Sequence, residues 1–157
     1  MKNIPVFYPV HPNDLIRNWS DFGYCISPIS KTWQFHTGID LTAPQGKDVY
    51  ASGAGKVTHT GYDYRGYGKY IVINHGTEHF RTLYSHLSEI AVTKGDKVHP
   101  GSVLGKIGNT GESTAPHLHF EIRIDHNCVD PDDFLIPLNA DEYNAVLNQA
   151  AHNNQAI

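Results

Sequence analysis

Hydrophobic and polar residues alternate without interruption along residues 117–124. The apolar positions are Leu118, Phe120, Ile122 and Ile124, and the polar positions between them are His117, His119, Glu121 and Arg123. A strict period of two with one apolar side predicts a half-buried β-strand. Two imidazoles then share one face, with Cα atoms about 6.5–7 Å apart at a rise of ~3.3 Å per residue. Both can reach one metal ion, or one can bind the ion while the other acts on its bound water. Two exposed strand histidines are the simpler alternative.

The same alternation occurs in residues 34–41. Phe35, Thr37, Ile39 and Leu41 share one face, and His36, Gly38 and Asp40 share the other. In a straight strand the Cα atoms of His36 and Asp40 would lie about 13 Å apart, near the limit for binding one ion. We expect the backbone to bulge or bend at Gly38 and bring the two side chains together. A strand with an ordinary glycine irregularity is the alternative for this segment alone.

The rest of the chain predicts many short strands and one helix. We expect strands over residues 21–26, 49–51, 55–59, 69–75, 80–87, 92–98 and 103–108. Strands 69–75 and 80–87 form a hairpin around Gly76-Thr77-Glu78, and a further turn lies at Ser27-Pro28. In the tail, Tyr143, Val146, Leu147 and Ala150 follow helical spacing, with Asp141 as the N-cap and the apolar stripe packed on the sheet. These elements predict an all-β fold of antiparallel sheets with a short C-terminal helix.

The prolines near the N-terminus divide the chain into an arm and a body. Pro5, Pro9 and Pro12 exclude regular structure up to about Asn13. We therefore interpret residues 1–20 as an arm that lies on the domain, anchored by Phe7, Tyr8 and Trp19. The single domain then covers residues 21–138, and residues 139–157 form the helix and tail.

Composition fits a single folded domain and excludes several function classes. The chain has 157 residues, of which 39% are hydrophobic and 18% are charged, so it can bury a core and is not mainly disordered. A formal charge of −4 offers no basic surface for a nucleic acid or an anionic membrane. The eleven histidines invite a search for metal ligands. We expect a monomer.

The cysteines and the N-terminus bear on the compartment. Cys25 and Cys128 match no metal or redox spacing, so we expect both to be reduced and buried. A disulfide between them is the alternative, and it requires an oxidising compartment. Residues 1–9 do not resemble a secretory signal, and no apolar run is long enough to span a bilayer. A protein of this sequence that acts outside the cell is expected to be exported by another route, or to have been trimmed.

Three segments together carry the residues of a hydrolytic metal site. They contribute His36 with Asp40, His86 at the end of strand 80–87, and His117 with His119. Two imidazoles and a carboxylate around an open position are typical of catalytic zinc, which lowers the pKa of bound water towards ~7. Hydrolysis of an amide also needs a base and a group that steadies the oxyanion and protonates the leaving amine. Five residues meet this requirement, but their spacing does not assign the roles, and Glu121 could also ligate.

At this point the chain resembles a known family, the lysostaphin-like zinc peptidases of peptidoglycan (peptidase family M23, also called LytM domains). The resemblance is carried by residues 35–41, with H-x-x-x-D, and by residues 113–121, with H-x-H. Between and after them lie Val49–Gly53, Gly66-Tyr67-Gly68, Thr82–Leu87, Gly95–Val98, Gly108–Gly111 and Asp130-Pro131. The matching segments run in order from about residue 21 to residue 135.

The resemblance implies a fold and a role for each site residue. The fold would be a lysostaphin-like barrel-sandwich, with the peptidase domain over residues 21–138. His36, Asp40 and His119 would bind one Zn²⁺ per chain. His117 would be the general base, and His86 would stabilise or protonate the tetrahedral intermediate. Two positions depart from the family: Ala115 replaces its usual glycine, and Cys25 replaces a frequent basic residue.

The expected function is a zinc metallo-endopeptidase that cleaves peptide bonds in the stem or cross-link of bacterial peptidoglycan. Its partners would be peptidoglycan peptides, and it would act in the periplasm or outside the cell. One alternative is a peptidase-fold regulator without activity, and another is a zinc peptidase that acts on other peptides. A lipoyl or biotinyl carrier module is excluded, since such modules need a lysine flanked by methionines and the only methionine is Met1.

Overall fold

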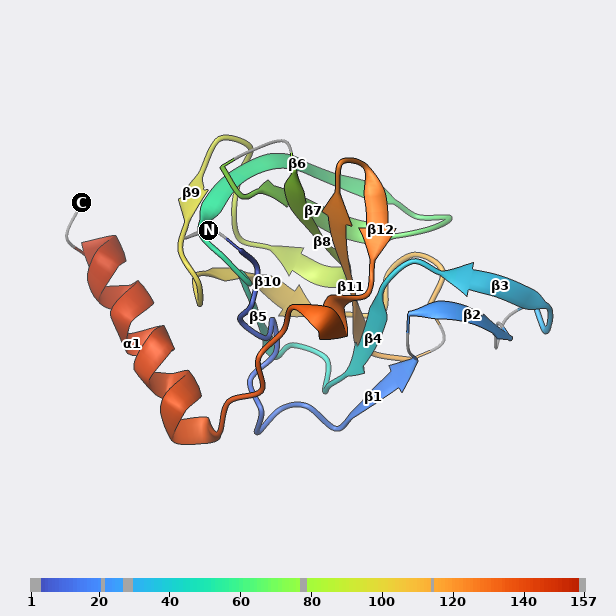
Figure 1. Cartoon of the computed structure of the whole chain (residues 1–157), viewed down its shortest axis with the longest axis horizontal. Helices are drawn as coiled ribbons and strands as arrows, with labels where there is room; N and C mark the ends of the chain where they lie inside the picture. Colours follow the sequence, from blue (N-terminus) through green and yellow to red (C-terminus); the bar gives the residue numbers. More distant parts are fainter. Residues whose placement is uncertain (1–3, 21, 27–29, 77–78, 114, 156–157) are drawn as a thin grey trace.

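The fold is built almost entirely from antiparallel strands (Figure 1). The computed structural model describes residues 4–20, 22–26, 30–76, 79–113 and 115–155. The strands are β1 (Arg17–Ser20), β2 (Gly23–Ile26), β3 (Trp33–His36), β4 (Ile39–Thr42), β5 (Asp48–Tyr50), β6 (Gly55–Asp63), β7 (Gly68–Asn74), β8 (Phe80–Ile90), β9 (Lys97–Val98), β10 (Val103–Ile107), β11 (His117–Ile124) and β12 (Asn127–Val129). A 3₁₀ helix follows at Pro131–Asp133, and helix α1 spans Ala140–Gln155.

One large sheet places the segments of interest side by side. Its strands follow the order β1-β4-β11-β8-β7-β6-β9; β10 pairs with β5 and β8, and β12 pairs with β11. Strands β2 and β3 form a separate two-stranded sheet. Every pairing between these strands is antiparallel, so the predicted fold class is confirmed. Strand β11 therefore lies between β4 and β8, which carry Asp40 and His86.

The core forms on one face of this sheet because apolar side chains alternate along the central strands. Ile39 and Leu41 of β4 and Leu118, Phe120 and Ile122 of β11 are all fully buried there. Successive side chains in a strand point to opposite faces. Hence Asp40, His119 and Glu121 lie on the other face of the same strands.

The prediction that β11 is only half-buried is wrong. Its polar face is buried as deeply as its apolar face, with His117, His119 and Glu121 exposed by 4%, 6% and 0%. The reason is that Tyr67 and Thr37 bond to Glu121 and cover this side of the strand. Periodicity identifies the side to which a residue points, but it does not show what covers that side.

The segment 34–41 divides into two strands in two different sheets, as the expected bend at Gly38 implies. β3 ends at His36, β4 begins at Ile39, and Thr37 and Gly38 join them. A β-carbon at Gly38 would collide with the carbonyl oxygen of Phe120, so only glycine allows this close approach. Figure 1 shows the β2–β3 hairpin projecting from the body of the molecule. Phe35 is 44% exposed as a result, and so it does not share a buried face with Ile39.

Several other predicted elements differ in detail from those observed. The β7–β8 hairpin is confirmed, although Thr77 and Glu78 of its turn lie outside the described residues. The predicted turn at Ser27-Pro28 also lies outside them. Strand β6 continues to Asp63, beyond the predicted end at residue 59, because it pairs along β7 as far as Gly68. Strand β9 is only Lys97–Val98, much shorter than the strand expected over residues 92–98.

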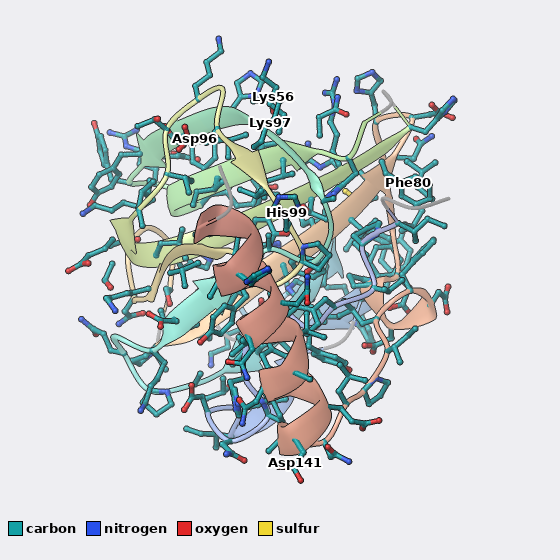
Figure 2. The ribbon with its side chains drawn as sticks, turned by 90° about the vertical axis from the view of Figure 1, so that its left-hand side faces the viewer. Lys56, Phe80, Asp96, Lys97, His99 and Asp141 are labelled. Carbon is teal, nitrogen blue, oxygen red and sulfur yellow. The ribbon has the colours of Figure 1, made fainter. Side chains whose placement is uncertain are left out.

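The C-terminal helix is confirmed, but its predicted cap is wrong. Asn139, not Asp141, is the capping residue: its Oδ1 accepts from the Glu142 backbone N–H at 2.8 Å. Glu142 Oε1 accepts in return from the Asn139 N–H at 3.0 Å, which is a capping box. Figure 2 shows Asp141 at the end of α1 with its side chain directed away from the sheet.

Helix α1 packs on the N-terminal arm and on the turn at Gly101, where we had expected it to pack on the sheet. Tyr143 stacks on Phe7 with ring centroids 4.2 Å apart, and its hydroxyl donates to the Tyr8 carbonyl. Tyr50, at the end of β5, completes this small cluster. Phe7 is buried and Tyr8 half-buried, so both anchor the arm as expected, whereas the side chain of Trp19 lies outside the described ones.

The arm also contains regular structure. After the prolines, β1 at Arg17–Ser20 pairs with β4. The division of the chain at residues 20 and 138 stays a prediction. Cys128 is free and half-buried, and the side chain of Cys25 is not among those described. Within the described residues, no helix combines the length and the apolar character that a membrane crossing requires.

Candidate metal centre

His36 and Asp40 meet across the break between β3 and β4. His36 is the last residue of β3, and Asp40 is the second residue of β4. The turn at Thr37-Gly38 brings His36 Nε2 to 3.2 Å from Asp40 Oδ2. In a straight strand the Cα atoms of His36 and Asp40 would lie ~13 Å apart. The bend brings their side chains together, because Gly38 allows the chain to pass against the backbone of β11.

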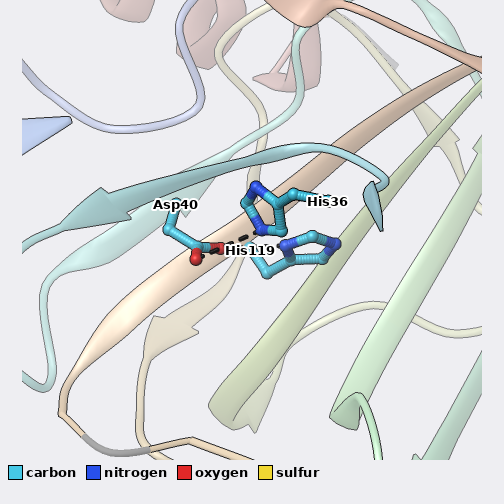
Figure 3. A group of neighbouring side chains, drawn as sticks. All are labelled: His36, Asp40 and His119. Atoms are coloured by element: carbon cyan, nitrogen blue, oxygen red, sulfur yellow. Dashed lines mark hydrogen bonds and ion pairs between the residues drawn. The ribbon is translucent and has the colours of Figure 1, made fainter. Parts of the chain in front are cut away.

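His119 joins this pair from the neighbouring strand. In the register of β11 with β4, His119 lies directly opposite Asp40. Directly opposed residues in an antiparallel pair point to the same face, and His119 Nδ1 lies 2.9 Å from Asp40 Oδ1. One ligand atom from each of the three residues lies within 4.8 Å of the others. Figure 3 shows the two imidazoles converging on the carboxylate from different strands.

The electrostatics of this cluster favour a cation. Burial raises the pKa of Asp40, but the hydrogen bonds and charges of His119 and His36 outweigh burial and hold that pKa well below its ordinary value. Burial lowers the pKa of His119, yet its bonds to Asp40 and Glu121 raise the net value to about 9. Positive charge is therefore stabilised between buried carboxylates. Two imidazole nitrogens and one carboxylate oxygen are also the donor set of many catalytic zinc sites, so these residues fit a bound zinc ion.

Glu121 holds His119 from the side opposite to Asp40. Burial raises the pKa of Glu121, but its hydrogen bond and charge interaction with His119 lower the net value to about 2. As an ionised carboxylate it accepts from His119 Nε2 at 2.8 Å. The Nε2 proton is thereby fixed, and the Nδ1 atom faces Asp40. The open possibility that Glu121 is itself a ligand is not supported, because its carboxylate lies outside the three-residue group.

The Glu121 carboxylate is fully buried and satisfied by several donors. Thr37 Oγ1 and Tyr67 OH each donate to Oε2 at 2.7 Å. Arg123 donates to Oε1 through Nε at 2.9 Å and Nη2 at 2.6 Å. Buried carboxylates are retained where they are paired and hydrogen-bonded. These hydrogen bonds therefore hold the Glu121 carboxylate in place, and that carboxylate fixes the orientation of His119.

His117 and His86 lie next to the cluster, and each is held by a hydrogen bond from its Nδ1 to a backbone carbonyl. His117 Nδ1 lies 2.7 Å from the Ala115 carbonyl oxygen, and His86 Nδ1 lies 2.6 Å from that of Thr110. Since a carbonyl only accepts, each Nδ1 carries the proton and each Nε2 is the basic nitrogen. The two rings are 4.8 Å apart, and His117 Nε2 lies 3.7 Å from Asp40 Oδ1.

The backbone at His86 adopts an uncommon conformation. Its φ is +62°, which non-glycine residues rarely adopt outside functional sites or turns. Its N–H donates to the Tyr67 carbonyl at 2.7 Å, which ties this strand to the loop 64–67. Burial lowers the pKa of His86 to about 4, although the Thr110 carbonyl and the Asp40 charge act against this. The imidazole is accordingly neutral at neutral pH.

All five residues singled out in the sequence converge here, but several of their partners were missed. The carbonyls of Ala115 and Thr110 could not be identified from the sequence, because every residue carries a backbone carbonyl. Arg123 had a usable signal, since it lies two residues after Glu121 on the same strand face. Ala115, which stands where the family resemblance implies a glycine, is exposed. Outside this site, His75 is buried and bonded to Ala54 O and Thr82 Oγ1.

The chain is similar in sequence to a family of peptidases and to several curated proteins. Residues 34–131 match the model of peptidase family M23. The DD-carboxypeptidase/endopeptidase Mpg of Neisseria meningitidis serogroup B is 43% identical over 130 residues, which are 83% of this chain and 30% of Mpg. The peptidoglycan DD-endopeptidase ShyA of Vibrio cholerae is 45% identical over 98 residues, or 62% of this chain and 22% of ShyA. This chain thus spans less than a third of either relative.

Solved structures agree with this placement. A zinc-containing peptidase from Vibrio cholerae superposes with a TM-score of 0.73 at 33% identity, covering 83% of this chain and 40% of that one. The catalytic domain of lysostaphin from Staphylococcus simulans gives 0.70 at 32% identity, covering 78% of this chain and 92% of that domain. The fold is therefore lysostaphin-like. Together, the family match and these similarities show that the chain belongs to peptidase family M23.

Proposed function

We propose that this chain is a zinc metallo-endopeptidase that hydrolyses peptide bonds in the stem or cross-link of bacterial peptidoglycan. The observation that carries the proposal is the convergence of His36, Asp40 and His119, with ligand atoms within 4.8 Å, beside two further oriented histidines. The similarity to Mpg and ShyA supports the substrate class. The proposed site of action, the periplasm or the cell exterior, follows from that substrate.

His36, Asp40 and His119 would hold the zinc ion. When bound in such a set, zinc polarises a carbonyl group and makes water a stronger acid. Asp40 remains ionised because its pKa is held low, and His119 keeps its Nδ1 toward the centre because Glu121 binds Nε2. The similarity to a zinc-containing peptidase supports the choice of metal.

His117 would act as the general base. Its Nδ1 proton is engaged by the Ala115 carbonyl, so Nε2 is the atom that takes a proton from the attacking water. Nε2 also lies 3.7 Å from Asp40 Oδ1, which places it next to the ligand set. A negative charge at this distance stabilises the imidazolium that forms when the proton arrives.

His86 would stabilise or protonate the tetrahedral intermediate. Its Nδ1 proton stays hydrogen-bonded to the Thr110 carbonyl, so Nε2 first takes up the proton released from the attacking water; because the pKa of His86 is low, Nε2 then passes that proton readily to the leaving amine. The Thr110 carbonyl keeps Nε2 directed away from the loop and available. A regulator without activity has no need of these two oriented proton carriers, so the structure favours the enzyme over that alternative.

The test is to incubate the purified chain with peptidoglycan sacculi and with defined muropeptides and to identify products by mass spectrometry. Zinc content is measured on the same sample by elemental analysis. The proposal expects about one zinc per chain and new peptide termini that disappear when zinc is chelated. Bound zinc with intact muropeptides would contradict the substrate assignment, and cleavage that is insensitive to chelation would contradict the metal mechanism.

A further inference from the structure

A pocket of about 490 Å³ lies next to the metal centre on the same face of the large sheet. In the register of β11 with β8, His119 faces Ser85, Glu121 faces Leu83 and Arg123 faces Arg81. Directly opposed residues share a face. His119, Glu121 and Arg123 therefore lie on one face of β11. Arg123 lines the pocket, and its Cα is about 13 Å from that of the candidate ligand His119 at ~3.3 Å per residue.

The pocket has an apolar floor and an aromatic wall that it shares with the metal centre. Leu83 of β8 faces Val72 of β7, and both line the pocket. Tyr67 forms the shared wall: it lines the pocket, and its ring lies 5.9 Å from that of His119. An extended peptide lying over Tyr67 would therefore contact both places, since four residues span about 13 Å.

Arg81 and Arg123 both line this pocket, and within the described part of the chain only Arg123 is paired. Arg123 is bonded through Nε and Nη2 to Glu121. Arg81 lies directly opposite Arg123 on the next strand, an arrangement of like charges that is unfavourable in itself. Its Nε is buried and has no hydrogen-bond partner among the described residues. A buried donor without an acceptor is costly unless something supplies the acceptor.

The acidic residue that lines the pocket does not fill this role. Asp63 is exposed and its Oδ2 accepts from the Tyr67 backbone N–H at 3.3 Å. It forms no ion pair with Arg81. Within the described residues no acceptor pairs with Arg81, so its guanidinium is left for a group that enters the pocket, and a planar carboxylate is the group that an arginine fork binds best.

We propose that this pocket is a subsite for a carboxylate of the peptide substrate, bound by Arg81 and lying a few residues from the bond that is cut. The inference rests on the proposed peptidase function and deepens it by naming an acidic peptide as substrate. The carboxylate has two possible sources: the free C-terminus of a peptide, or an acidic side chain or branch within it.

The test compares matched stem peptides in two pairs. In the first pair the C-terminus is a free acid or an amide, and in the second an internal carboxylate is free or amidated. We expect the free acid of one pair to be cut with a kcat/KM about 10- to 100-fold higher than its amide, the range for a charge-assisted hydrogen bond. The pair that shows this preference identifies the source of the carboxylate.

Variants then assign the effect to Arg81. Arg81→Gln should remove the preference by slowing the acid while leaving the amide unchanged, and Arg81→Lys should retain part of it. Lys97→Gln removes the same charge from an exposed position on β9 and should behave as the parent protein. Equal rates for acid and amide in both pairs, or an equal loss for both substrates in Arg81→Gln, would overturn the subsite.

Calorimetric binding of the same peptides to the purified chain separates this inference from the proposed function. Mass spectrometry of each sample reports whether any peptide has been cut. If no peptide is hydrolysed, the proposed function fails, while tighter binding of the acid than of the amide, lost in Arg81→Gln, still supports the subsite. If peptides are hydrolysed but acid and amide bind equally, the subsite fails and the peptidase stands.

Discussion

At the scale of single residues, the site separates side chains that would hold metal from side chains that would move protons. His36, Asp40 and His119 are in mutual contact, whereas His117 and His86 are each anchored through Nδ1 to a backbone carbonyl. This difference predicts different consequences of substitution.

His36→Ala or Asp40→Ala should lose zinc and activity together, because each removes one of three ligands. His117→Ala should keep zinc and lower kcat at least ~10²-fold, the usual cost of removing an acid–base group. Elemental analysis and turnover of a muropeptide, measured on the same preparations, check both expectations. His152→Ala on the exposed face of α1 serves as the control. Full turnover in His117→Ala would refute its role as the base.

A second prediction concerns Glu121, whose carboxylate fixes the Nε2 proton of His119. Glu121→Gln should weaken zinc binding about 10- to 100-fold, the range observed when a partner of a metal-bound histidine is changed. Competition with a chromogenic chelator measures the affinity, and circular dichroism verifies the fold. Glu89→Gln removes the same charge from an exposed position on β8. Unchanged zinc affinity in Glu121→Gln would show that the orientation of His119 does not depend on this contact.

At the scale of elements, the site depends on the break between β3 and β4. Gly38 passes against the Phe120 carbonyl of β11, and this approach brings His36 over Asp40. The chain must shift if a side chain is added at this point.

Gly38→Ala should therefore weaken zinc binding and destabilise the fold by about 1–3 kcal/mol, the usual cost of a steric clash in a packed region. Chelator competition and urea unfolding measure the two effects. Gly95→Ala is a matched control, since Gly95 has φ +101° but an added β-carbon meets nothing within 4 Å. It should lose stability without losing zinc affinity. Wild-type zinc affinity in Gly38→Ala would contradict the importance of this bend.

The sequence predicted the strands of the site better than their surroundings. The alternation over residues 117–124 identified which side chains share a face, and Gly38 identified the bend. The burial of the polar face of β11 could not be inferred, because Tyr67 reaches Glu121 from a loop 54 residues away in the chain. The cap of α1 was misplaced because Asn139 and Asp141 are both good capping residues, and only the position of the first turn distinguishes them.

The spacing of the residues was not sufficient to assign the metal ligands. Pattern alone left open which histidine of H-x-H binds metal, and the family resemblance chose His119. The structure supports that choice through the register of β11 with β4, which places His119 opposite Asp40. Register depends on long-range pairing and is not visible in either segment alone.

At the scale of the whole molecule, a buried histidine outside the candidate site links distant strands. His75 is hydrogen-bonded to the Ala54 carbonyl and to Thr82 Oγ1, and Thr82 Oγ1 is also hydrogen-bonded to Tyr84 OH. Burial lowers the pKa of His75 below its ordinary value of 6.5, and the bond to the Ala54 carbonyl opposes this only in part.

This histidine should make stability fall as the solution is acidified. Below pH 6.5, and down to the lowered pKa of the folded state, the unfolded chain binds more protons than the folded chain, so the free energy of unfolding decreases as pH falls. Each unit by which the pKa is lowered corresponds to about 1.4 kcal/mol. Urea unfolding at pH 7 and pH 5, with a chelator present, measures the change.

His75→Gln isolates this contribution, because the other titrating groups are the same in both proteins. The stability advantage of the parent protein over His75→Gln should shrink between pH 7 and pH 5. His152→Gln, at an exposed position on α1, should show the same pH dependence as the parent. An advantage that is constant or grows on acidification would show that His75 is not held neutral in the folded protein.

The most direct test of the proposed zinc site is X-ray diffraction from crystals grown with zinc, recorded just above and just below the zinc absorption edge. The difference between the two data sets locates zinc independently of any assumption about its ligands. We predict one strong peak per chain, in contact with His36, Asp40 and His119 and not with Glu121. Absence of a peak at these residues, while zinc occupies another place in the chain, would contradict it.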